Sequence, residues 1–507
     1  MYGAVYGGAA AVNAAAINAM IAFVRSTFDL GVYDFKYELD FQGVVWNCSA
    51  AINATLIRQP GLVFKNGGID SSAAGAIALN MSGTNTPTFR SFHVHGDSTN
   101  QPAVGILFSR ALSGGGFGGV TNTIIDGLTT TGSFTKSAVI NFAAEEFTAH
   151  GLNLVNQSRS LTSYCYIACN HAGTLDDYVG GVTSTFATIP TAANGAQSNI
   201  LHNLSNFSFH RDAVNPPSVT AISKANPAVV THAPADLVAS GITNGSKVFH
   251  HDIGGMTQLN GNVYTVANIN LVAGTFELAG VDSTGFSTFT GGGRSWNQTG
   301  PAMLMGGGDA LMAVSSYLLA YGNDPLVIDT KNGGGPRMFN MEVQMEPQPP
   351  AAVKFGLPSA GTTVLHGFRL HLLSANQNFS DAVIREDAGA GSLRIDDLDL
   401  RVYNMGVAPP DKVFKTPAKW SIHKGRITVP LAAALNASPA SFTEYTVDEA
   451  AFDRSPMTVL HGVREYRNDI SAPIRIASYG AGAGDGPLVQ TMRESASPAD
   501  GGFLGRV

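Results

Sequence analysis

Short alternations of apolar and polar residues recur along most of the chain, and each is interrupted by one small or polar pivot. Clear copies occupy residues 125–129, 149–154, 365–370 and 395–400, and looser copies occupy 64–66, 89–94, 201–204, 339–343 and 422–427. Alternation with a period of two predicts β-strands with one buried face. Its recurrence at a regular spacing predicts that the strands stack as repeats of one unit.

The spacing of the pivots supports a stacked fold and locates an insertion. The pivots lie at 66, 91, 127, 151, 203, 340, 367, 397 and 424, and most steps are 24 to 36 residues. The step of 52 residues from 151 to 203 predicts two turns. The step of 137 residues from 203 to 340 needs an insertion, and removal of residues 219–294 leaves about two turns.

Residues 219–294 change character and predict a small antiparallel β-domain. Five compact strands are expected, at 219–222, 228–231, 247–250, 264–266 and 275–278. Turn pairs such as Asn260-Gly261 and Ala273-Gly274 separate strands of this kind in antiparallel sheets.

The N-terminal region predicts an amphipathic helix over residues 9–25. Ile17, Ile21 and Val24 follow the spacing of one helical face, and such a helix would cover the open end of a strand stack. The stretch lacks a basic leading region, and Asn13 and Asn18 interrupt its apolar run. Neither a signal peptide nor a membrane span is therefore expected.

Composition agrees with an all-β chain and excludes several kinds of site. Charged residues make up 13% and glycine is abundant at 58 residues, which suits many strands and turns. The net charge of -7 argues against nucleic acid as a partner. Cys165 and Cys169 lie near His171, but three cysteines in all make buried free thiols simpler than a metal site or disulfides. No nucleotide-binding or metalloprotease motif is present, so no cofactor is expected.

Two segments resemble known families. Residues 2–5 with 15–21, and then residues 61–69, resemble the entry motif and first rung of pectate-lyase-like right-handed β-helix proteins, a group that includes many phage tailspikes. Val12, Asn13 and Ala14 replace the acidic helix cap of that family. The resemblance covers residues 1 to about 430 apart from the insertion.

The insertion resembles a module of phage tail proteins that is related to a β-domain of ubiquitin-activating enzymes. The matching residues are 254–261, 264–266, 274–278 and 291–293. Together the two resemblances imply an all-β right-handed parallel β-helix, or solenoid, with an N-terminal capping helix and an inserted small antiparallel β-domain. The expected divisions are a cap (1–60), helix parts (61–218 and 295–435), the insertion (219–294) and a C-terminal cap, oligomerisation or attachment segment (436–507).

Candidate catalytic residues lie on one predicted strand. Met341 and Val343 should point inward, whereas Glu342, Gln344 and Glu346 should form an outward ladder. Glu342 and Glu346 are the candidate catalytic pair, although residues four apart on a strand are separated by about 13 Å. Paired-carboxylate glycosidases need about 5–10 Å, so a partner from an adjacent rung fits better. A solvated strand face is the simplest interpretation.

Ligand-binding candidates surround the end of the insertion. Trp296, Tyr317, Tyr321 and Gln344 combine aromatic faces with an amide, a combination suited to carbohydrate, and a cleft between wall and insertion is a natural place for a ligand. Trp296 could equally pack the domain junction.

One further strand carries a possible metal or proton-transfer motif. His93, His95 and Asp97 share one face of a strand, where they could bind a metal or move protons. Ordinary outward polar positions of a rung produce the same pattern, and this is the preferred interpretation. No metal site is therefore assigned.

The family resemblance implies three hypotheses for function. The first is a homotrimeric spike on the virion, on its tail or head, that binds host surface polysaccharide such as capsule or lipopolysaccharide. The second is a polysaccharide depolymerase, a glycoside hydrolase or lyase, on the same scaffold. The third is a structural fibre component. Other virion proteins would be partners, and nucleic acid and membranes would not.

Overall fold

The computed structural model describes most of the chain up to residue 428 and two strands beyond it. The described residues are 7–28, 36–57, 61–109, 111–113, 116–118, 120–142, 145–169, 201–211, 215–306, 310–329, 337–348, 352–356, 362–372, 383–387, 392–402, 414–415, 420–428, 441–448 and 463–467. Residues 2–5 of the entry motif lie outside them, as does His171.

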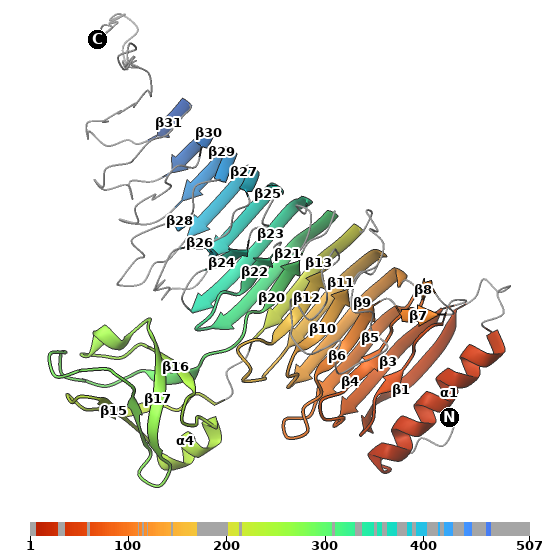
Figure 1. Ribbon diagram of the computed structural model, residues 1–507, viewed down its shortest axis with the longest axis horizontal. Coiled ribbons are helices and arrows are strands. Elements are labelled where there is room, and N and C mark those ends of the chain that lie inside the picture. Colours follow the sequence, from red (N-terminus) through yellow and green to blue (C-terminus); the bar gives the residue numbers. More distant parts are fainter. Residues whose placement is uncertain are drawn as a thin grey trace, which may run out of the picture.

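Two long parallel sheets form the body of the protein (Figure 1). The larger sheet has thirteen described strands. In spatial order these are β1 (Tyr37–Cys48), β3 (Leu62–Ser71), β5 (Thr88–Gly96), β9 (Thr121–Gly132), β11 (Glu145–Val155), β13 (Leu201–His210), β21 (Ala310–Tyr321), β23 (Arg337–Gln348), β25 (Thr362–Leu372), β27 (Ser392–Val402), β29 (Trp420–Thr428), β30 (Ser441–Asp448) and β31 (Val463–Arg467).

The second sheet has ten described strands. They are β2 (Ile52–Asn53), β4 (Ile77–Asn80), β6 (Val104–Ser109), β10 (Ser137–Phe142), β12 (Tyr164–Cys169), β20 (Met303–Gly306), β22 (Leu326–Asp329), β24 (Val353–Gly356), β26 (Ile384–Asp387) and β28 (Phe414–Lys415). From β1 to β29 the chain alternates between the two sheets, apart from a short antiparallel hairpin of β7 (Ala111–Ser113) and β8 (Gly116–Gly118) and an inserted domain. The prediction of an all-β fold built on long parallel sheets is confirmed.

The recurring pivots are left-handed bends that lie side by side in the larger sheet. Positive φ angles of 47–75° occur at Asn66, Ser91, Gly127, Gly151, Asn206, Asn340, Gly367 and Asp397. Strand register aligns the bends from Asn66 to Asn206 in one row, and those of Asn340, Gly367 and Asp397 in a second row. Glycine adopts this conformation without strain, and Asn and Asp tolerate it better than most residues, which explains the pivot composition.

Two details of the predicted repeat were wrong. The sequence placed one pivot at Asn203, whereas the left-handed residue of β13 is Asn206. The interval after Gly151 was interpreted as two turns, but β13 pairs directly with β11, so it is a single step. Alternation along 201–210 is regular on both sides of the bend, so the local pattern could not distinguish the two asparagines.

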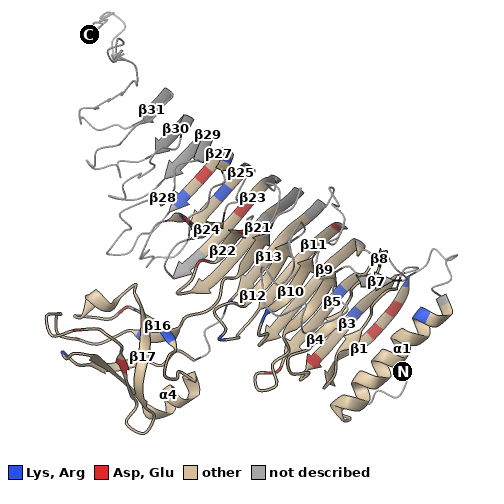
Figure 2. Cartoon of the chain, in the orientation of Figure 1, with Lys and Arg blue, Asp and Glu red and all other residues tan. Residues whose placement is uncertain are grey.

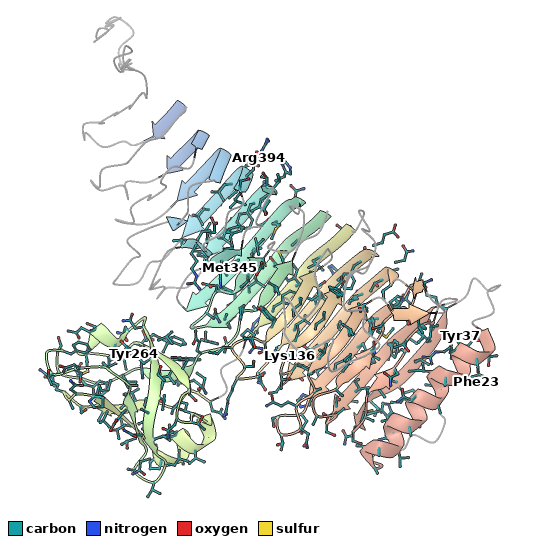
Figure 3. All side chains as sticks on the ribbon, viewed as in Figure 1. Phe23, Tyr37, Lys136, Tyr264, Met345 and Arg394 are labelled. Atoms are coloured by element: carbon teal, nitrogen blue, oxygen red, sulfur yellow. The ribbon has the colours of Figure 1, made fainter. Side chains whose placement is uncertain are left out.

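Apolar side chains fill the space between the two sheets. Phe64 and Phe89 are fully buried with ring centroids 5.3 Å apart, and Phe92 packs edge-on at 5.5 Å from Phe64. On β23, Met341 and Val343 are 1% exposed while Gln344 is exposed, so the predicted inward and outward alternation is confirmed. Figure 3 shows side chains throughout the stack, with Met345 labelled on β23.

Helix α1 (Ala10–Phe28) covers the first strands, as predicted. Its inward residues Ile17, Ile21 and Val24 are buried in the core. Asn18, one of the residues that interrupt the apolar run, donates a hydrogen bond to the Ala51 carbonyl at 2.8 Å. A window of α1 has a mean hydropathy of 1.2 and would suit a membrane by length and composition alone. Its buried face shows that here it closes the end of the core.

The inserted domain is a six-stranded antiparallel sheet that closes into a barrel. The strands, in spatial order, are β14 (Val219–Ile222), β15 (Ala228–His232), β18 (Thr275–Leu278), β17 (Val263–Asn270), β16 (Lys247–His251) and β19 (Arg294–Asn297). A bridge between Ser218 and Arg294 closes the seam between β14 and β19. Helix α4 (Pro234–Ser240) and the turn η1 (Thr257–Leu259) complete the domain, hereafter the barrel.

The observed limits of the elements differ slightly from the expected divisions. Strand β19 belongs to the barrel and runs to Asn297, beyond the expected boundary at 294. Strands β30 and β31 continue the larger sheet in parallel beyond the expected boundary at 435. The sequence pattern missed β19 because its four residues alternate too briefly to show a period.

Candidate functional site

A groove of about 500 Å³ crosses the outer face of the larger sheet at its middle strands. Its lining residues come from β11, β13, β21 and β23, which lie side by side in Figure 1. They are Gly151, Leu152, Asn153, Asn206, Phe207, Ser208, Ser316, Tyr317, Glu342 and Gln344. Three residues singled out by sequence, Tyr317, Glu342 and Gln344, therefore meet in one site.

One row of side chains runs along the groove across all four strands. Register pairs Asn153 with Ser208, Ser208 with Tyr317, and Tyr317 with Gln344. Neighbouring strands are about 4.8 Å apart, so the row places two amides, a hydroxyl and a phenol at regular intervals over about 14 Å. Such a row can donate and accept hydrogen bonds along an extended neutral ligand.

The left-handed bends explain why the sheet is hollow at this point. Gly151 and Asn206 occupy the bend positions of β11 and β13, with φ of 70° and 51°. A Cβ on Gly151 would meet nothing closer than 3.5 Å, so the absence of a side chain leaves space above the strand. The side chains of Leu152 and Phe207, beside these bends, are buried in the core between the two sheets and not exposed on the outer face.

Glu342 is the one carboxylate among the described residues that line the groove. It is half-buried, and register places it beside the exposed Arg369 of β25. Figure 2 shows that strands β23, β25 and β27 carry charged residues, with both signs on β27. Register places Glu346 beside Leu319, but the Glu346 side chain lies outside the described residues. The described lining residues thus include no pair of carboxylates of the kind that glycosidases use.

Trp296 and Tyr321 lie at the junction between the barrel and the stack, away from the groove lining. Their rings stack with centroids 4.5 Å apart and an interplanar angle of 13°. Phe249 of β16 stacks on both at 6.2 Å. Each ring thus covers one face of the other, which supports packing of the domain junction, while ligand binding by Trp296 and Tyr321 stays a prediction.

A Ser–His contact at the groove was missed by sequence analysis. The Ser208 hydroxyl lies 2.5 Å from Nε2 of His210, and the His210 ring lies 5.2 Å from the Tyr317 ring. The only signal for this contact was the spacing of the two residues, which puts both on one face of β13. That spacing is common on strands, and the groove beside it could not be read from the sequence.

The other motifs have structural roles. Two threonines of the next strand contact these histidines. Nδ1 of His93 lies 2.8 Å from the Thr129 hydroxyl, and Nδ1 of His95 lies 2.8 Å from the Thr131 hydroxyl. A carboxylate oxygen of Asp97 accepts hydrogen bonds from backbone N–H groups two and three residues further along, as in an Asx turn. No cluster of metal-binding side chains occurs among the described residues, in which this histidine strand is included.

The cysteines also fit the simpler interpretation. Cys48 and Cys165 are buried free thiols, and burial raises the pKa of Cys48 to about 12. The Cys165 thiol donates to the His210 carbonyl at 3.1 Å, while the Cys169 side chain lies outside the described residues. A thiol with a raised pKa is protonated at neutral pH and is a poor metal ligand.

Comparison with known proteins gives no independent assignment. The chain matches no protein-family model and no curated protein. The function must therefore be argued from the groove and the fold.

Proposed function

We propose that this protein is a virion spike that binds a host surface polysaccharide in the groove across β11, β13, β21 and β23. The two parallel sheets would be walls of a right-handed parallel β-helix of the tailspike type, carrying the barrel as a side domain. Three copies would pack side by side and attach to other virion proteins. The long parallel sheets and the alternation of the chain between them support this architecture.

The groove carries the proposal. Its outward row of Asn153, Ser208, Tyr317 and Gln344 offers neutral hydrogen-bonding groups and one aromatic ring, which suit hydroxyl-rich sugars. The row crosses strands along the long axis of the stack, so a polymer can lie over several strands at once. Binding without cleavage is favoured over hydrolysis because Glu342 has no second carboxylate within the described groove lining.

Loss of the aromatic ring or the amide should weaken polysaccharide binding. We expect Tyr317→Ala and Gln344→Ala each to lower affinity by roughly 5- to 10-fold, since each removes about 1 kcal/mol of stacking or hydrogen bonding. Thr148→Ala is the matched control, because Thr148 is exposed on β11 but does not line the groove. Affinity would be measured on immobilised bacterial capsular polysaccharides and lipopolysaccharides.

Size-exclusion chromatography of the polysaccharide separates the three hypotheses. An unchanged polymer that is retained by the protein supports the binding spike. If wild type shortens the polymer and Glu342→Gln does not, the result would instead support a depolymerase. Absence of binding to every polysaccharide tested would leave the structural fibre component.

A further inference from the structure

The Ser208–His210 pair has the geometry of a nucleophile and its general base. The two residues are two apart on β13, and the hydroxyl oxygen lies 2.5 Å from Nε2. When His210 carries its proton on Nδ1, the hydroxyl donates to Nε2, which is the arrangement that activates a serine. Ser208 lines the groove, so a ligand bound there reaches its oxygen.

The surrounding strands hold His210 in place. Its carbonyl accepts hydrogen bonds from the Asn156 N–H at 3.0 Å and the Cys165 thiol at 3.1 Å. Its ring packs against Tyr317 of β21 at an interplanar angle of 51°. Strand β13 is paired on both sides, with β11 and β21, so the pair sits on a rigid element in the middle of the sheet.

We propose that Ser208 and His210 form an esterase site that removes O-acetyl groups from the saccharide bound in the groove. The proposal rests on the proposed function for its substrate, because the leaving group is a sugar hydroxyl held by the polar row. The amides of Asn153 and Asn206 line the same groove and carry N–H donors for a negatively charged oxygen.

The reaction proceeds in two balanced steps. The Ser208 oxygen attacks the acetyl carbonyl carbon while Nε2 of His210 accepts the hydroxyl proton. The bond between the carbonyl carbon and the sugar oxygen breaks, His210 returns the proton to that oxygen, and acetyl-Ser208 remains. Water then attacks the acetyl carbon while His210 takes a proton from the water, the bond between that carbon and the Ser208 oxygen breaks, His210 delivers the proton to Ser208, and acetic acid leaves. The net reaction is ester plus water to sugar hydroxyl plus acetic acid.

The same strand provides a matched control. Ser205 lies 3.1 Å from Nδ1 of His150 on the neighbouring strand β11, so it is also a serine in contact with histidine. Neither residue lines the groove, and the contact is exposed. Ser205→Ala therefore removes a Ser–His contact without touching the proposed site.

Hydrolysis of 4-nitrophenyl acetate and labelling by a fluorophosphonate probe test the site without knowledge of the natural sugar. We expect wild type to hydrolyse the ester and to carry one label on Ser208, located by peptide mass. Ser208→Ala and His210→Asn should each lower the rate by at least about 100-fold, and Ser208→Ala should abolish the label. Ser205→Ala should match wild type in both measurements.

Two results would overturn the proposal: a Ser208→Ala variant as fast as wild type, or a label on residues other than Ser208. Polysaccharide binding, measured separately, distinguishes this failure from failure of the proposed function. Retained binding with no esterase activity refutes only the esterase site. If esterase activity depends on Ser208 but the protein binds no polysaccharide, the binding spike is refuted and the catalytic pair is retained.

Discussion

Acidification should loosen the barrel, and its amide hydrogens should lose protection by about tenfold for each pH unit between about 6.5 and 4.5. The cause is a buried chain of hydrogen bonds across the barrel seam. The Ser295 hydroxyl of β19 lies 2.9 Å from Nε2 of His250 and 3.2 Å from Nε2 of His232. All three side chains are at most 2% exposed.

The hydrogen bonds determine which nitrogen carries the proton. His232 Nδ1 lies 2.9 Å from the Ser218 carbonyl, so it is protonated and donates. Its Nε2 therefore accepts from the Ser295 hydroxyl, and the Ser295 oxygen accepts from the Nε2–H of His250. Both rings are then neutral, and Nδ1 of His250 is buried without a hydrogen-bond partner in the described part of the chain.

The direction of the pH effect follows from the pKa values of the two histidines. Burial lowers the pKa of His250 from 6.5 to about 3, with smaller contributions from His232 and His251. Burial also lowers the pKa of His232, which the Ser218 carbonyl and Asp236 oppose. Between about pH 6.5 and pH 3 the unfolded barrel binds more protons than the folded barrel. The stability that the two neutral histidines contribute is therefore fully present above about pH 6.5 and is lost progressively toward pH 3.

Hydrogen exchange of peptides from β15, β16 and β19, corrected for the intrinsic rate at each pH, measures the effect locally. His250→Gln should flatten the pH dependence, because an amide can donate to Ser295 but does not titrate. His251→Gln is the control, since His251 is partly exposed and paired with Asp252 at 2.7 Å. Equal protection of wild-type amide hydrogens at about pH 6.5 and about pH 4.5 would contradict the prediction.

Replacement of Ile125 by alanine should destabilise the stack by about 2–5 kcal/mol, whereas Ile124→Ala should change stability by less than about 0.5 kcal/mol. The two residues are adjacent on β9, but Ile125 is 1% exposed in the core and Ile124 is 45% exposed. Removal of a buried side chain leaves a cavity between close-packed sheets, while an exposed side chain has few contacts to lose.

Guanidinium unfolding followed by circular dichroism at a strand wavelength compares the two variants with wild type. Both variants replace isoleucine by alanine on the same strand, so burial is the only large difference between the two positions. Similar midpoints for Ile124→Ala and Ile125→Ala would contradict the assignment of inward and outward faces on β9.

Local patterns predicted the elements well because their causes are local. Alternation identified most strands of the larger sheet but missed β21, β30 and β31, and helical spacing identified α1, whose Ile17 and Ile21 are buried as expected. The insertion was visible because its strands and turns interrupt the repeat. The bend residues were recognisable for the same reason, since a left-handed backbone selects for Gly, Asn or Asp at that position itself.

The candidate site was only partly predictable. Outward placement of Glu342 and Gln344 followed from alternation, but alternation treats every outward residue alike. Trp296 shows the limit: an aromatic residue beside an insertion fits either a ligand or a domain junction. Its stack with Tyr321, 4.5 Å away, favours the junction. The Ser208–His210 contact went unnoticed because nothing in its spacing marks it as a site.

The sequence by itself therefore determined a repeated, strand-rich chain with a capping helix, an inserted β-domain and a sorting of residues into inward and outward faces. The tertiary structure decided which outward residues meet. Parallel pairing brings Asn153, Ser208, Tyr317 and Gln344 into one row although Tyr317 follows Ser208 by 109 positions in the sequence. Register between strands is set by packing across the whole sheet, so no local pattern could have specified the groove.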